Sequence, residues 1–211
     1  MKFAYLALAA ALALAGCASR GAHPASVAAA TAPDWRTIAT EHDRERLREW
    51  RTAWVTALRK ANAAGFGPTI AREGVLLQPD AALAWQAPPD GDYRCRVLKI
   101  GAKAAGNLDY VTYPTFNCRI RSEAGLVSFA KLTGSQRPIG HFLPTTGNRM
   151  IFLGTLQLGD ERRALEYGRD RERDMAGLIE MIGPNRWRLV LPYPHFESTI
   201  DVIELIPRTA S

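Results

Sequence analysis

Residues 91–121 read GDYRCRVLKIGAKAAGNLDYVTYPTFNCRIR, and this stretch decides the fold. Apolar and polar side chains alternate over Tyr93–Val97 and again over Phe116–Ile120, which is the period-two pattern of strands with one buried face. The turn residues Ala105–Asn107 separate the two arms. We therefore predict an antiparallel hairpin, with an edge position or bulge where Pro114 interrupts the second arm.

Both arms of this hairpin carry a cysteine on the apolar face, Cys95 on the first and Cys118 on the second. Cysteines on facing strands can be bridged when their Cα atoms lie within roughly 7 Å of each other. We expect a disulfide, with a stabilising effect of about 3 kcal/mol in the chain-entropy model. Two buried free thiols are the alternative.

The strand pattern continues to the end of the chain, with short segments separated by turn signals. Together with the hairpin they make about eight strands, and no helical segments alternate with them, which argues against a parallel sheet. We expect a mainly β (α+β) fold, an antiparallel barrel of about eight strands that is lipocalin-like and has no edge strand. A two-sheet sandwich is the alternative. The later strands are predicted at Leu126–Leu132, Pro138–Leu143, Arg149–Leu158, Met175–Ile182, Arg186–Leu191 and Thr199–Ile206.

Ahead of the β domain, which we place at residues 91–207, the segment 34–65 predicts one long helix. Thr40 provides its capping signal and Gly65 its end. Residues 66–90 are rich in proline and predict a connector, with a short helical turn at Asp80–Leu83. One face of the helix is apolar, so we expect Trp50 and Trp54 to pack it on the barrel. This face consists of Leu47, Trp50, Trp54, Leu58 and Ala61.

The first 17 residues predict a lipoprotein signal peptide, because a short apolar run leads to the lipobox Leu14–Cys17. The run is shorter than the about 20 residues that span a bilayer. We expect Cys17 to be lipidated, with an ordinary signal peptide as the alternative. Residues 18–33 predict a flexible tether. Ala18 resembles the sorting signal for the outer membrane, so we expect a lipid-anchored envelope protein that faces the periplasm.

The formal net charge is +6, but the arginines are scattered among acidic residues through the whole chain. A nucleic-acid partner would favour a concentrated basic patch, so we expect none. The predicted lipid anchor makes the membrane the expected partner, with another envelope protein or a lipid as further candidates.

Bulky apolar residues on most strands predict a filled barrel, without a ligand cavity of about 300 Å³ or more. A binding surface would then lie at the barrel mouth. The residues predicted to face inward are Val97, Phe129, Phe152, Leu156, Ile179, Trp187, Leu189 and Val202. The candidate binding surface at the mouth consists of Lys131, Gln136, Arg137, Arg173, His195 and Glu197.

The sequence contains no Gly-x-Ser-x-Gly elbow, no His-Glu-x-x-His motif and no phosphate loop with the required spacing. His141 with His195 and Glu197 is a weak metal pattern, so we expect neither a metal nor a cofactor. We favour a protein that is not an enzyme.

Seven segments resemble one uncharacterised family of alphaproteobacterial envelope proteins, the domain of unknown function 4893. They are DWR, ATEHDRERLREWRTAW, DYRCRVLKIG, KLTGSQRPIG, IFLGTLQLGDE, YGRDRERDMAG and RWRLVLPYPHFES, within residues 34–207. The resemblance implies that these segments form one domain, and it implies no activity. Our leading hypothesis is a non-enzymatic binding or scaffold module. A barrel that binds a lipid or small molecule is the alternative, and a hydrolase using His195 and Glu197 is the second alternative.

Overall fold

The computed structural model describes residues 33–123 and 125–208. The predicted signal peptide, its Cys17 and residues 18–32 of the predicted tether lie outside the described residues. The described chain begins with helices and continues with strands. The helical elements are α1 (Trp35–Ile38), α2 (Glu41–Arg48), α3 (Trp50–Ala61), a π-helical turn η1 (Asn62–Phe66), α4 (Gly67–Glu73) and a 3-10 turn η2 (Gly74–Leu77).

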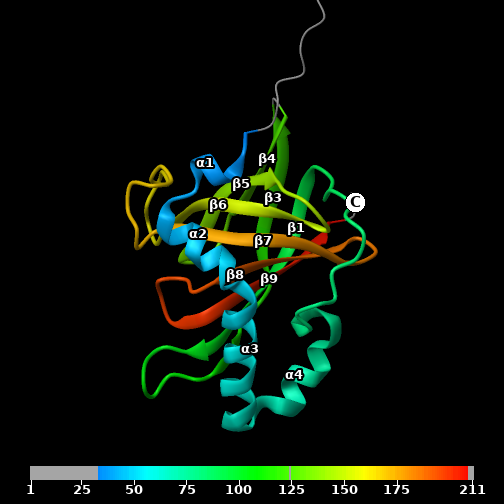
Figure 1. Cartoon of the computed structure of the whole chain (residues 1–211), viewed down its shortest axis with the longest axis vertical. Helices are drawn as coiled ribbons and strands as arrows, with labels where there is room; N and C mark the ends of the chain where they lie inside the picture. Colours follow the sequence, from blue (N-terminus) through cyan, green and yellow to red (C-terminus); the bar gives the residue numbers. More distant parts are fainter. Residues whose placement is uncertain (1–32, 124, 209–211) are drawn as a thin grey trace, which may run out of the picture. The chain divides into compact units, whose positions relative to one another are not determined.

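The strands form one antiparallel sheet that closes into a barrel (Figure 1). Neighbours follow chain order from β3 to β9, and β1 pairs with β3 on one edge and with β9 on the other. Eight strands therefore complete the barrel, and the short β2 adds to β1. The strands are β1 (Gly91–Ala102), β2 (Tyr110–Thr112), β3 (Phe116–Glu123), β4 (Leu126–Lys131), β5 (Gln136–Pro144), β6 (Arg149–Leu158), β7 (Asp174–Gly183), β8 (Arg186–Pro192) and β9 (Ser198–Pro207).

The hairpin that suggested this fold has the predicted form. Its second arm is divided into β2 and β3, and the gap contains Pro114. The predicted disulfide is present between Cys95 and Cys118, whose Cα atoms are 5.9 Å apart. It joins the neighbouring strands β1 and β3 inside the barrel, where both cysteines are fully buried.

The barrel has an apolar interior and a second apolar layer outside, between its wall and the helices. Three phenylalanines, Phe129, Phe142 and Phe152, pack against one another in the interior, with ring centroids 5.7 to 5.9 Å apart. All the residues predicted to face inward lie in the interior cluster except Val202, which belongs to the outer layer. That assignment was wrong because β9 is buried along most of both faces, so its pattern does not distinguish inside from outside.

Helices α2 and α3 supply the outer layer (Figure 1). Helix α2 contacts β7, and α3 contacts β1, β8 and β9. Trp54 is fully buried in this layer, and Trp50 is half-buried beside it, as expected for an apolar helix face. Small residues bring α3 close to the wall, since a Cβ added at Gly101 would lie 3.0 Å from the Cα of Ala57.

The helical segment differs from the prediction in three places. The extended residues 39 and 40 separate the short α1 from α2. Glu49, with φ −90° and ψ 9°, divides the predicted long helix into α2 and α3. Gly65 has the left-handed φ of 92° expected at a helix end, but the chain resumes as α4, with Pro68 in its first turn. Proline is favoured at that position because its missing N–H would have no helical partner. The turn predicted at Asp80–Leu83 is not helical. Within the described ranges, every helix is too short or too polar to cross a bilayer.

The segment after α4 is fixed to the barrel by two side chains of β8. Arg188 is fully buried and pairs with the buried Glu180 at 2.7 Å. The Arg188 guanidinium also lies 4.5 Å from the ring centroid of Trp54. Trp187 donates from its indole to the carbonyl of Gln86 at 2.8 Å. The Arg188 guanidinium further donates to the carbonyls of Val75, Leu76, Gln78 and Pro79.

Candidate functional site

A pocket of about 230 Å³ opens at one end of the barrel. Its walls come from inward-facing positions of the strands and carry both apolar and charged side chains, and aromatic side chains also line it. The interior beyond the pocket is packed, as predicted, and the pocket is smaller than the size that we excluded. Its lining includes Val97, Leu156, Met175 and Ile203 on the walls, the aromatic residues Tyr113, Phe116 and Phe196, and the charged residues Lys99, Lys131, Glu197 and Asp201.

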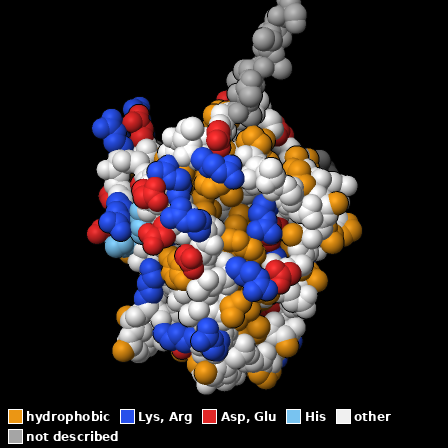
Figure 2. Space-filling view, in the orientation of Figure 1, with side chains coloured by type: hydrophobic (Ala, Val, Ile, Leu, Met, Phe, Trp, Pro, Cys, Tyr) orange, Lys and Arg blue, Asp and Glu red, His pale blue; other side chains and the backbone are white. Residues whose placement is uncertain are grey.

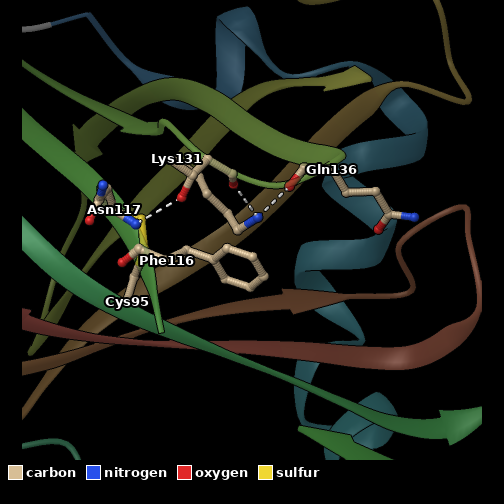
Figure 3. The surroundings of a disulfide bond; sticks show 7 residues. Cys95, Phe116, Asn117, Lys131 and Gln136 are labelled. Carbon is tan, nitrogen blue, oxygen red and sulfur yellow. Dashed lines mark hydrogen bonds between the residues drawn. A yellow bond between two sulfur atoms is a disulfide. The ribbon is translucent and has the colours of Figure 1, made fainter. Parts of the chain in front are cut away.

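Lys131 is the most unusual group in this pocket. It is the last residue of β4 and only 3% exposed, and its ammonium lies 3.6 Å from the ring centroid of Phe116 (Figure 3). The ammonium donates to the carbonyls of Thr133 and Gln136, each at 2.8 Å. Burial, together with the nearby charges of Arg137 and Lys99, lowers the pKa of Lys131 to about 8.

Lys131 forms no ion pair with any residue that the structure describes. An ammonium has three donors, and the two carbonyls leave one of them available. At neutral pH the side chain therefore presents a buried positive charge that a carboxylate or phosphate could neutralise.

A second lysine in the pocket is paired. The Lys99 ammonium lies 3.0 Å from an oxygen of Asp201 and 3.2 Å from an oxygen of Glu197. Burial opposes its charge, but the two carboxylates raise the pKa of Lys99 above its ordinary value. Burial raises the pKa of Asp201, which also accepts a hydrogen bond from the hydroxyl of Ser198. This wall of the pocket is a satisfied network, unlike the wall that carries Lys131.

Four of the six residues predicted at the mouth line the pocket, and two do not. Arg173 pairs with Glu161 at 3.0 Å beside the pocket. Arg137 donates to backbone carbonyls and so fixes the turn that follows β6. The residues brought together are Lys131, Gln136, His195 and Glu197, and the Gln136 amide donates to Glu197 at 3.4 Å.

The arrangement of His195 and Glu197 does not resemble a hydrolytic pair. The Glu197 carboxylate faces Lys99, whereas the His195 ring lies edge-on to Phe196 and 3.8 Å from Glu172. No hydrogen bond joins His195 to Glu197 within the described part of the chain. His141 is exposed on β5, and no three His, Cys, Asp or Glu side chains of residues 33–123 and 125–208 form a metal-binding group.

Sequence reasoning missed Lys99 and Asp201. A signal was available, because Lys99 continues the inward series that begins at Tyr93, and Asp201 occupies the matching position of β9. The loop between β8 and β9 is also unusual. Tyr193 and Glu197 have left-handed φ values of 47° and 67°, which cost non-glycine residues about 1–3 kcal/mol each and cluster at functional sites.

The fold and the site define a closed antiparallel barrel whose mouth forms a small pocket with apolar, aromatic and buried charged side chains in its lining. A family model described as Domain of unknown function (DUF4893) matches residues 35–205, and the chain belongs to this family. Searches among curated proteins and among solved structures found no match.

Proposed function

We propose that this protein is a non-enzymatic binding module of the cell envelope. It takes the end of a small amphipathic ligand into the barrel mouth, with the anionic group of that ligand beside Lys131. The observation that carries this proposal is the buried ammonium of Lys131, which has no ion-pair partner in the described structure and borders an apolar pocket.

The pocket size limits the kind of ligand. Sites that enclose a drug-sized molecule measure about 300–1,000 Å³, and this pocket measures about 230 Å³. It suits one end of an amphiphile, such as a carboxylate with a short alkyl or aromatic group. The aromatic side chains of the pocket would contact the apolar part of such a ligand. Because Lys99 is already paired with two carboxylates, Lys131 is the cation that would attract the negative charge of the ligand.

The binding experiment uses decanoate and the neutral decanol as probes in titration calorimetry. Lys131→Met should weaken decanoate binding about tenfold or more, because a charged hydrogen bond contributes about 1.5–3 kcal/mol. It should leave decanol binding unchanged. The affinity for decanoate should also fall as the pH rises through about 8, since Lys131 loses its proton there while the carboxylate stays ionised.

The matched control for this experiment is Lys60→Met, which removes a half-exposed lysine of α3 outside the pocket. It should leave both affinities unchanged. The proposal fails if the unaltered protein does not bind decanoate, or if the two variants weaken binding equally.

The envelope location is supported by the lipobox that ends at Cys17. Acylation of that cysteine would hold the barrel at a membrane surface, where amphiphiles are abundant. Cys17→Ser should release the protein from the membrane fraction or leave its precursor unprocessed. Fractionation of cells that express either form provides the measurement, and recovery of the unaltered protein in the soluble periplasmic fraction would contradict the anchor.

A further inference from the structure

A second concave site lies outside the barrel, next to the mouth. It is a groove of about 410 Å³, and we call it the outer groove. Helix α2, the chain just after β1, the loop before β7 and the loop between β8 and β9 contribute to it. His195 belongs to both the outer groove and the mouth pocket. The groove is lined by His42, Arg46, Lys103, Arg171, Glu172, Tyr193 and His195.

The outer groove has more positive than negative groups. Its lining holds three cations and one carboxylate, apart from the two histidines. Figure 2 shows histidine side chains at one edge of the molecule among those of Lys, Arg, Asp and Glu, over α2 and the loop before β7. Mixed charge is common on a protein surface, so the pairing of each cation decides whether the groove could bind an anion.

Arg46 is 3% exposed, and its guanidinium is only partly satisfied. Nη1 donates to Asp43 at 2.8 Å and to the carbonyl of Asp174 at 3.0 Å, and Nε donates to the carbonyl of Pro192 at 3.2 Å. Nη2 is buried and has no hydrogen-bond partner among the described residues. A buried donor of this kind destabilises the fold when it is left unsatisfied, and such groups in native proteins call for an explanation.

Unlike Arg46, the other two cations lack carboxylate partners among the described residues. The Lys103 ammonium donates only to backbone carbonyls, those of Pro194 and His195, and burial followed by the charge of Arg46 lowers its pKa. The Arg171 guanidinium lies 3.3 Å from Nδ1 of His42 and forms no ion pair in residues 33–123 and 125–208. Burial makes the largest contribution to lowering the pKa of His42, and the positive charges of Arg171 and Arg46 lower it further. The groove therefore holds two cations without a carboxylate partner among the described residues, beside Arg46, whose ion pair with Asp43 leaves Nη2 without a hydrogen-bond partner.

We propose that the outer groove binds a phosphoryl group through Arg46, Lys103 and Arg171. Guanidinium groups match the oxygens of phosphate in geometry and stay charged at all physiological pH values. The phosphoryl group would accept from Lys103 and Arg171 and lie beside the guanidinium of Arg46, whose charge its own would help to neutralise. A soluble phosphate monoester and a lipid with a phosphate headgroup carry the same chemistry, so the experiment separates these two sources.

The test uses the full chain and two kinds of probe. Titration calorimetry with glycerol phosphate measures binding of a soluble phosphoryl group. Cosedimentation with vesicles of phosphatidylcholine, with or without phosphatidic acid, measures binding of the lipid form. Arg171→Gln and Lys103→Gln should each weaken binding about tenfold, the loss expected for one charged hydrogen bond. Arg46 is not substituted in this test. Its loss would leave the buried Asp43 carboxylate without its ion-pair partner, so a folding defect would be expected.

The matched control is Arg169→Gln, which removes the same charge from the same loop, where the arginine is exposed and pairs with Glu166. Binding of glycerol phosphate that depends on Arg171 and Lys103 supports a soluble ligand, and binding confined to phosphatidic acid supports a lipid. The proposal is overturned if neither probe binds, or if Arg169→Gln weakens binding as much as Arg171→Gln does. Lys131→Met should leave binding at the outer groove unchanged. The test of the outer groove can therefore succeed or fail independently of the test of the mouth pocket.

Discussion

Arg188→Met should lower the free energy of unfolding by about 3–5 kcal/mol, the loss expected when one partner of a buried ion pair is removed. The variant removes the fully buried partner of the Glu180 carboxylate and leaves it only the partly exposed Arg149, at 3.1 Å. It also removes the side-chain donor of four carbonyls between Val75 and Pro79. Urea denaturation of the purified protein, followed by circular dichroism, provides the measurement.

The matched control is Arg186→Met, two residues earlier on the same face of β8. Arg186 pairs with Glu204, and its side chain is 31% exposed. A partly exposed pair of this kind contributes about 0–1 kcal/mol, so the control should lose far less stability. Equal losses in the two variants would show that the buried pair is not what fixes the segment after α4.

Trp54→Ala should also cost about 3–5 kcal/mol, as large-to-small changes of a buried tryptophan do. Trp54 is fully buried in the layer between α3 and the barrel, and its indole donates to the carbonyl of Leu77 at 3.1 Å. The variant leaves a cavity there and removes the ring over which Arg188 lies. The midpoint of urea denaturation should fall accordingly.

Trp50→Ala is the comparison for this variant, because Trp50 lies one turn earlier with its ring 6.2 Å from that of Trp54 and is only half-buried. It should lose less than half as much stability. If neither change alters the denaturation midpoint, α3 does not contribute to the stability of the barrel. Trp54 contacts Arg188, so the effects of Trp54→Ala and Arg188→Met should not add when the two are combined.

The barrel was predictable because its signals are local. Each strand has its own alternation and is bounded by turn residues, and both cysteines fall on facing arms of one hairpin. The helix α4 was missed because Gly67 and Pro68 suggested a connector, although proline in a first turn starts a helix as readily as it ends one. The break at Glu49 has no distinctive signal in the sequence.

The mouth was partly predictable for a similar reason. In an antiparallel barrel every second turn lies at the same end, so Lys131 and Gln136 could be placed near His195 and Glu197. The partners of buried charges were beyond sequence reasoning, because they depend on distant pairing. Lys99 meets Asp201, and Arg188 meets the carbonyls of residues 75–79, across about a hundred positions of the chain.

The first and last strands of the barrel, β1 and β9, are hydrogen-bonded neighbours. Tyr93 lies opposite Pro207 at one end of this pairing, and Ala102 lies opposite Ser198 at the other. During synthesis the N-terminus leaves the ribosome first. One edge of β1 therefore stays unpaired until residues 198–207 have also left the ribosome. Such long-range pairing slows folding, and an open edge can pair with another chain. A chain that stopped before Ser198 would keep two open edges, on β1 and β8, and would be prone to join other chains edge to edge.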